Sequence, residues 1–87
     1  MQRITFRAEI FLEGDVYVGL SPELNVSSFG ENIEDARNSL QEAVEAFIEE
    51  CEAMGTLEEI MEEAGFVKKG GTWISPKLVK QELLSVG

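Results

Sequence analysis

The chain has 87 residues and a formal net charge of −10, and 44% of its residues are apolar, which is too many for a disordered chain. A chain of this length forms one domain (residues 1–87) and buries only about 60–65% of its unfolded surface, so a partner or a second copy would add stability. The absence of histidine excludes Ser-His and Cys-His catalytic pairs and most zinc sites.

Strand patterns fill the first thirty residues. Apolar and polar side chains alternate over residues 4–12, which predicts one half-buried antiparallel strand. A turn at residues 13–15 leads into a second strand over residues 16–20, which ends before Pro22 because proline cannot donate to a ladder. Residues 24–29 predict a third, shorter strand. In the second strand we expect Val16, Val18 and Leu20 to continue the apolar face, and Tyr17 and Gly19 to point away from it.

A long amphipathic helix follows the strands. Apolar residues recur at spacings of three and four over residues 33–54, which makes one continuous stripe. Asn32 occupies the N-cap position, and Asp35, three residues later, can reach back as in a capping box. Gly55 suits the left-handed position that follows a helix.

The C-terminal third contains a second helix and a turn signal. Thr56 and Glu59 have the S/T-x-x-E spacing of a capping box, which predicts a short helix ended by Gly65. Residues 66–74 predict a β-hairpin around a Lys-Lys-Gly-Gly turn. Residues 76–87 match neither the helical nor the strand period, so both alternatives stay open there.

The element order β-β-β-α-α-β predicts an α+β fold. We expect a three-stranded antiparallel meander with the long helix packed across one face. A short second helix and an uncertain C-terminal strand or hairpin complete the prediction.

Charge is distributed unevenly along the chain. Residues 31–63 contain twelve acids and one arginine, whereas residues 64–87 carry four lysines and one acid. Such an acidic segment repels nucleic acid and attracts a basic protein. It either binds such a partner or only keeps the protein in solution. The candidate partner-binding residues are the outer acids of the long helix, Glu42, Glu45, Glu49 and Glu52.

No residue pattern predicts catalysis, and we expect no enzyme activity. The lone Cys51 cannot form an intramolecular disulfide, and it lies on the apolar stripe among glutamates that disfavour a reactive thiolate. Adjacent carboxylates lie on helix surfaces rather than in a concave site. No spacing resembles a metal-binding or phosphate-binding loop, so no metal or cofactor is predicted.

A basic and aromatic cluster near the C-terminus offers an alternative function. Trp73 and Phe66 could stack on bases while lysines bind phosphates, as in a weak RNA-binding module. Four lysines on a chain of net charge −10 are a weak basic patch, so we do not expect this chain alone to bind nucleic acid. The lysines concerned are Lys68, Lys69, Lys77 and Lys80.

Residues 6–54 carry a recognisable pattern. A strand runs through Val16-Tyr17-Val18-Gly19-Leu20 to Pro22, a short strand ends at Gly30, and the helix begins with an acid–alanine pair at Asp35 and Ala36. This spacing resembles the N-terminal domain of HicB-like antitoxins. The chain departs from the family at Asn25 and Asn32, where the family often has glycine and threonine. Residues 56–87 show no DNA-binding domain, so operator binding is not expected.

The resemblance implies a partial RNase H-like fold and a sequestering role. The usual partner in that family is HicA, a small basic RNA-cleaving toxin, and an acidic protein would suit its basic face. The leading hypothesis is therefore an antitoxin-like protein that binds such a toxin. The second is a standalone self-associating structural or adaptor domain without a toxin.

Location and assembly are further expectations. The N-terminus opens directly on an alternating pattern without a signal peptide, and no apolar run is long enough for a membrane span, so we expect a cytoplasmic protein. Exposed edges of the meander would favour a homodimer or higher homo-oligomer by sheet extension.

Overall fold

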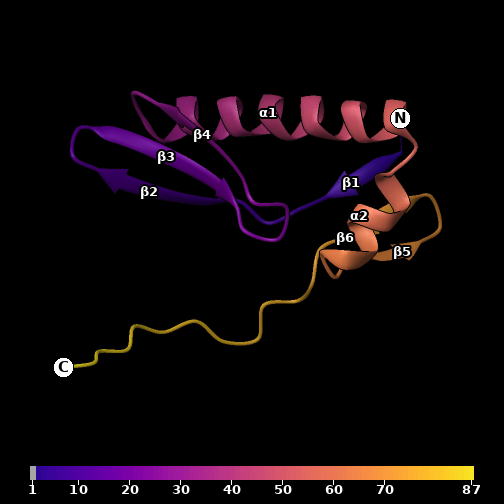
Figure 1. The fold of residues 1–87 in the computed structure, drawn as a ribbon. Helices are drawn as coiled ribbons and strands as arrows, with labels where there is room; N and C mark the ends of the chain where they lie inside the picture. The colour runs from indigo at the N-terminus through magenta and orange to yellow at the C-terminus, as the bar shows by residue number, and fades with distance from the viewer. Residues whose placement is uncertain (1) are drawn as a thin grey trace.

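The computed structural model describes residues 2–87, and its main unit is one long helix on an antiparallel sheet. Helix α1 (Ile33–Met54) lies along one face of β2 (Glu9–Glu13), β3 (Val16–Ser21) and β4 (Val26–Gly30), as Figure 1 shows. The sheet order is β2-β3-β4 with both pairs antiparallel. The predicted α+β class and the helix on a three-stranded meander are confirmed.

A second small sheet joins the two ends of the chain. Strand β6 (Thr72–Ile74) lies between β1 (Arg3–Thr5), to which it is parallel, and β5 (Val67–Lys69), to which it is antiparallel. The predicted hairpin is therefore confirmed as β5–β6. The prediction of one strand over residues 4–12 was wrong, because residues 6–8 interrupt it and β1 pairs with β6 rather than continuing into β2.

The caps of α1 explain its length. The Asn32 side chain accepts a hydrogen bond from the Asp35 N–H at 2.7 Å, which confirms the predicted N-cap. The Asp35 carboxylate reaches back to the Glu31 N–H at 2.9 Å, one residue before the position that a capping box would use. At the other end Gly55 has φ 72°, and the Gly55 and Thr56 N–H groups bond to the last turn as in a Schellman motif.

Helix α2 (Leu57–Glu63) begins without the predicted cap. The Thr56 side chain makes no capping hydrogen bond, and its hydroxyl instead donates to the Cys51 carbonyl at 3.4 Å. Thr56 has φ −111° and ψ 3°, whereas an N-cap needs extended backbone to aim its oxygen at the new helix. The same short connection that ends α1 therefore prevents Thr56 from capping α2.

Two glycines let α1 approach the sheet closely. A Cβ on Gly19 would lie 3.0 Å from the Ala36 carbonyl oxygen, and one on Gly30 would lie 2.5 Å from the Ala36 nitrogen. Gly19 therefore faces α1, and because strand residues alternate, its neighbours Val18 and Leu20 face the opposite side. The predicted orientation of this strand was wrong, since its apolar face points away from the helix.

The core gathers under the C-terminal half of α1, where α2 and the second sheet close over it (Figure 1). Trp73 is buried there, and its Nε1–H donates to the Gln2 side-chain oxygen at 2.6 Å. Residues 71 positions apart in the sequence thus meet at one point. The buried cluster comprises Leu24, Leu40, Val44, Ile48, Cys51, Leu57, Met61, Phe66 and Trp73.

The end of the chain has no regular structure. The Ser75 N–H donates to the Thr5 carbonyl at 3.0 Å, which extends the β1–β6 pairing by one bond. Residues 76–87 then form neither of the two alternatives, strand or helix, and residues 77–87 are all exposed. Figure 1 shows this segment, in yellow, running away from the body of the protein.

Candidate functional site

The four predicted acids form a stripe along α1, which we call the acidic stripe (Glu42, Glu45, Glu49 and Glu52). Their spacing of three and four residues places them on one side of the helix, away from the buried stripe. Glu42, Glu45 and Glu49 are exposed, and Glu52 is half-buried. Within residues 2–87 the ion pairs are Arg7–Glu9, Arg7–Glu23 and Lys80–Glu82, so none of them neutralises the stripe.

A hollow of about 380 Å³ opens where α1 turns into α2, and we call it the elbow hollow. Its apolar surface comes largely from Phe47, Met54 and Ile60, and two carboxylates, Glu50 and Glu59, stand beside them. The Met54 side chain is 69% exposed. A lysine or arginine side chain fits this chemistry, because its aliphatic stem can cover apolar surface while its charged end meets a carboxylate. The lining residues are Phe47, Glu50, Cys51, Met54, Thr56, Glu59 and Ile60.

The acidic stripe and the elbow hollow use different glutamates. None of the four predicted residues lines the elbow hollow, and Glu45 instead lines a smaller hollow between α1 and β1 with Gln2, Ile4 and Phe6. Glu50 and Glu59 were not predicted as site residues. The sequence signal that could have identified them is Gly55, because a sharp turn there brings the last turn of α1 beside the first turn of α2.

The acids of α2 extend the negative surface around the elbow. Each of them is exposed, and no ion pair within residues 2–87 involves them. Helix α2 also has no basic residue in its last turn. The negative region of the sequence therefore lies on both α1 and α2, and Glu50 and Glu59 bring the two helices' acids together at the elbow hollow. The acids are Glu58, Glu59, Glu62 and Glu63.

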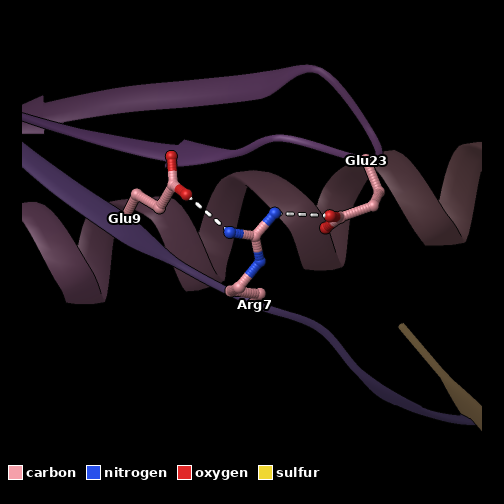
Figure 2. Close-up of polar contacts among 3 residues, drawn as sticks. All are labelled: Arg7, Glu9 and Glu23. Carbon is pink, nitrogen blue, oxygen red and sulfur yellow. Dashed lines mark hydrogen bonds and ion pairs between the residues drawn. The ribbon is translucent and has the colours of Figure 1, made fainter. Parts of the chain in front are cut away.

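A separate ion-pair network fastens the crossing between the two sheets (Figure 2). The Arg7 guanidinium donates to Glu9 at 2.6 Å and to Glu23 at 2.7 Å. The hydrogen bond to Glu23, with the nearby negative charges, raises the pKa of Arg7 above its ordinary value. Arg7 therefore stays charged at every physiological pH and ties the chain between β1 and β2 to the β3–β4 connection. This network is structural rather than part of the acidic surface.

The side of the β2–β3–β4 sheet opposite α1 carries five apolar side chains, which we call the open face (Phe11, Val16, Val18, Leu20 and Phe29). Glu9 and Glu13 lie on the same side of β2. The register aligns Phe11, Val18 and Phe29 in one row across the three strands. Phe29 is 71% exposed and Phe11 is 45% exposed. Side chains of this size seldom stay in water as a group on a monomer, so this face has the character of an interaction surface.

The basic and aromatic cluster does not form a base-stacking platform. Trp73 and Phe66 are both buried, and Lys68 covers the Trp73 ring with its Nζ 5.4 Å from the ring centroid. Bases cannot reach these rings without unfolding the second sheet. The structure thus removes the aromatic half of the RNA-binding alternative.

Within residues 2–87, no group of three or more His, Cys, Asp or Glu side chains is placed to hold a metal ion. Over the same residues, no helix is both long enough and apolar enough to cross a membrane.

Comparisons with protein-family models, with curated proteins and with solved structures found no significant match. The resemblance to HicB-like antitoxins therefore rests on the sequence pattern alone.

Proposed function

We propose that this chain is an antitoxin-like cytoplasmic protein that binds and sequesters a small basic RNA-cleaving toxin of the HicA type. The observation that carries the proposal is the array of carboxylates on α1 and α2, none of which is ion-paired within residues 2–87. An unpaired array of one sign raises the local concentration of oppositely charged partners and steers their approach.

Two parts of this surface have different roles in the proposal. The acidic stripe provides attraction over distance, and the elbow hollow provides a place for one basic side chain to be held. Glu50 and Glu59 stand beside apolar side chains there, so a bound cation is partly removed from water and its pairing is less screened. Sequestering follows because a toxin whose cationic surface is covered by carboxylates cannot bind the phosphates of RNA.

The proposed action is binding rather than catalysis. Three of the four carboxylates of the acidic stripe are exposed on the surface of α1, whereas acid–base catalysis uses carboxylates in an enclosed, partly dry site. The same negative surface disfavours direct binding of nucleic acid by this chain.

The test begins with capture of a partner from the source lysate, followed by measurement of affinity with the purified partner. The stripe variant, Glu42→Gln with Glu45→Gln, Glu49→Gln and Glu52→Gln, should weaken binding at least tenfold. The elbow variant, Glu50→Gln with Glu59→Gln, should also weaken it, and higher salt should weaken binding of the unmodified chain. The unmodified chain should stop RNA cleavage by the captured protein.

A matched control changes the net charge equally at other places. Glu13→Gln with Glu31→Gln, Glu34→Gln and Glu82→Gln removes four negative charges outside the stripe and the hollow. This variant should keep affinity within about threefold, since long-range attraction alone is screened over about 10 Å at ordinary salt. Equal losses in the stripe variant and the control, or a captured protein whose RNA cleavage is unaffected, would contradict the proposal.

A further inference from the structure

No helix or strand among residues 2–87 covers the open face. Gly19 and Gly30 face α1, so the residues beside them in β3 and β4 point to the other side of the sheet. In Figure 1, α1 lies on one side of β2 and β3, and the C-terminal segment runs on the other. Phe29 and Phe11 are the largest exposed side chains of this face, at 71% and 45%.

The C-terminal segment is the second unpartnered apolar feature. We call residues 77–87 the arm. Its aliphatic side chains are Leu78, Val79, Leu83, Leu84 and Val86, and Leu83 and Val86 are fully exposed. The Cα radius of gyration is 14.3 Å, whereas a compact chain of 87 residues has about 12 Å, which agrees with an arm that projects from the body.

We propose that the arm of one copy packs on the open face of a second copy, and that the exchange is reciprocal. Such a contact is isologous, so it closes on itself as a two-fold dimer. This interface lies on the side of the sheet opposite the acidic stripe, so it does not depend on the proposed basic partner.

The geometry allows the arm to reach the face. The arm begins after Pro76, which is held beside Gly65, and after Ser75, which bonds to Thr5. Eleven residues span at most about 36 Å, while strands of five or six residues are about 17–20 Å long. The arm can therefore cross the whole open face of a neighbouring copy.

Charge and size both favour a second copy as the occupant. The arm has a net charge of +1, from Lys77 and Lys80 against Glu82, and the rest of the chain has a net charge of −11. Electrostatic attraction therefore favours contact between the arm and the acidic remainder of a chain. Glu13 lies on the same side of β2 as Phe11, is exposed, and takes part in none of the ion pairs of residues 2–87. Face and arm together supply sixteen residues per copy, which approaches the lower end of the roughly 20–30 residues per side of a standard interface.

The experiment measures the mass in solution of the full chain by light scattering during size exclusion. The expected mass is twice the 9.7 kDa of one chain. The arm variant, Leu83→Glu with Leu84→Glu, and the face variant, Phe11→Thr with Phe29→Thr, should each dimerise at least tenfold more weakly. The control Ile33→Thr changes an apolar residue on α1 that is 60% exposed, and this variant should remain a dimer.

Mixing the two weakened variants gives the decisive result. The intact arm of the face variant should pack on the intact face of the arm variant, so the mixture should form a heterodimer with one restored contact. Far-ultraviolet circular dichroism, which reports mainly on the helix that packs on β2, β3 and β4, shows whether the face variant is folded. The arm variant changes two residues that are 100% and 82% exposed.

Three outcomes would overturn the proposal. The first is a wild-type chain that is monomeric at about 100 μM. If the arm of that monomer were protected from hydrogen exchange, the arm would cover the sheet of its own chain. The second is an arm variant that dimerises as well as the wild type, which would mean that two faces stack directly. The third is a mixture of the two variants that stays monomeric.

Discussion

At the scale of single residues, backbone conformation and the lack of a side chain at glycine determine how closely α1 approaches its sheet. Gly30 has no side chain at the point where the first turn of α1 passes over β4. Asn25 adopts φ 55° in the β3–β4 connection, a left-handed conformation that asparagine tolerates better than most residues. Asn25 therefore does what a glycine would do at that position in the antitoxin pattern.

The Gly30→Ala substitution tests this close approach. The added Cβ would lie 2.5 Å from the Ala36 nitrogen and 2.7 Å from the Asp35 carbonyl carbon, and backbone cannot move aside as a side chain can. We expect the free energy of unfolding to fall by about 2–3 kcal/mol, as for an overpacked core. Urea denaturation followed by circular dichroism measures the change.

Gly71→Ala is the matched control, because a Cβ there meets nothing within 4 Å and the residue does not need positive φ. It should change the free energy of unfolding by no more than about 0.5 kcal/mol. Equal effects of the two substitutions would mean that the helix does not approach β4 as closely as described.

At the scale of elements, the two ends of α1 are fixed by different chemistry. At the N-terminus the Asn32 side chain accepts from the Asp35 N–H and the Asp35 carboxylate accepts from the Glu31 N–H, whereas the C-terminus is ended by the left-handed Gly55. The acids in the first turn interact favourably with the positive end of the helix dipole, but the last turn has no basic residue to interact with the negative end. The C-terminal end therefore relies on its Schellman bonds and on packing against α2.

Two asparagine-to-alanine substitutions in α1 should have opposite signs. Asn32→Ala removes the N-cap and should lower the free energy of unfolding by about 1 kcal/mol. Asn38→Ala lies in the exposed helix interior, where alanine has the higher helix propensity, and should raise it by a few tenths of a kcal/mol. Thermal unfolding compares the two variants, and a shift of the same sign in both would argue against the cap.

At the scale of the whole molecule, the second sheet makes one cooperative unit of the chain. Strand β6 pairs with β1 from the opposite end of the sequence, and the buried cluster runs from Leu24 and Leu40 to Trp73. The proposed surfaces lie on opposite sides of this unit, with the acidic stripe on α1 and the open face under the sheet. A basic partner and a second copy could therefore be bound at the same time.

Cooperativity can be measured with two independent probes. The single tryptophan, Trp73, reports on the second sheet, and far-ultraviolet circular dichroism reports mainly on α1. We expect both probes to give the same urea midpoint. Leu40→Ala, a fully buried residue of α1 that packs beside Gly19 of β3, should lower both midpoints together through a loss of about 3 kcal/mol. A tryptophan transition that precedes the loss of helix would show that the second sheet unfolds separately.

Local signals in the sequence determined the elements with strong periodicity or distinct caps. The helix over residues 33–54, its Asn32 cap, its Gly55 end and the β5–β6 hairpin all follow from residue types within a few positions of one another. The side of α1 on which the acidic stripe lies was also predictable, because helical spacing alone keeps those glutamates away from the buried stripe.

Tertiary structure decided what depends on residues distant in the sequence. The strand predicted over residues 4–12 breaks because β6, some seventy residues later, takes β1 as its partner. The orientation of β3 depends on which of its sides α1 covers. Alternation alone predicted that the side with Val16, Val18 and Leu20 is covered, but α1 packs on the other side, where Gly19 leaves room for it. The elbow hollow likewise needs α1 and α2 to be side by side. Alternation in the sequence indicates that a strand has two faces of different polarity, but only the packing of another element determines which of them is buried.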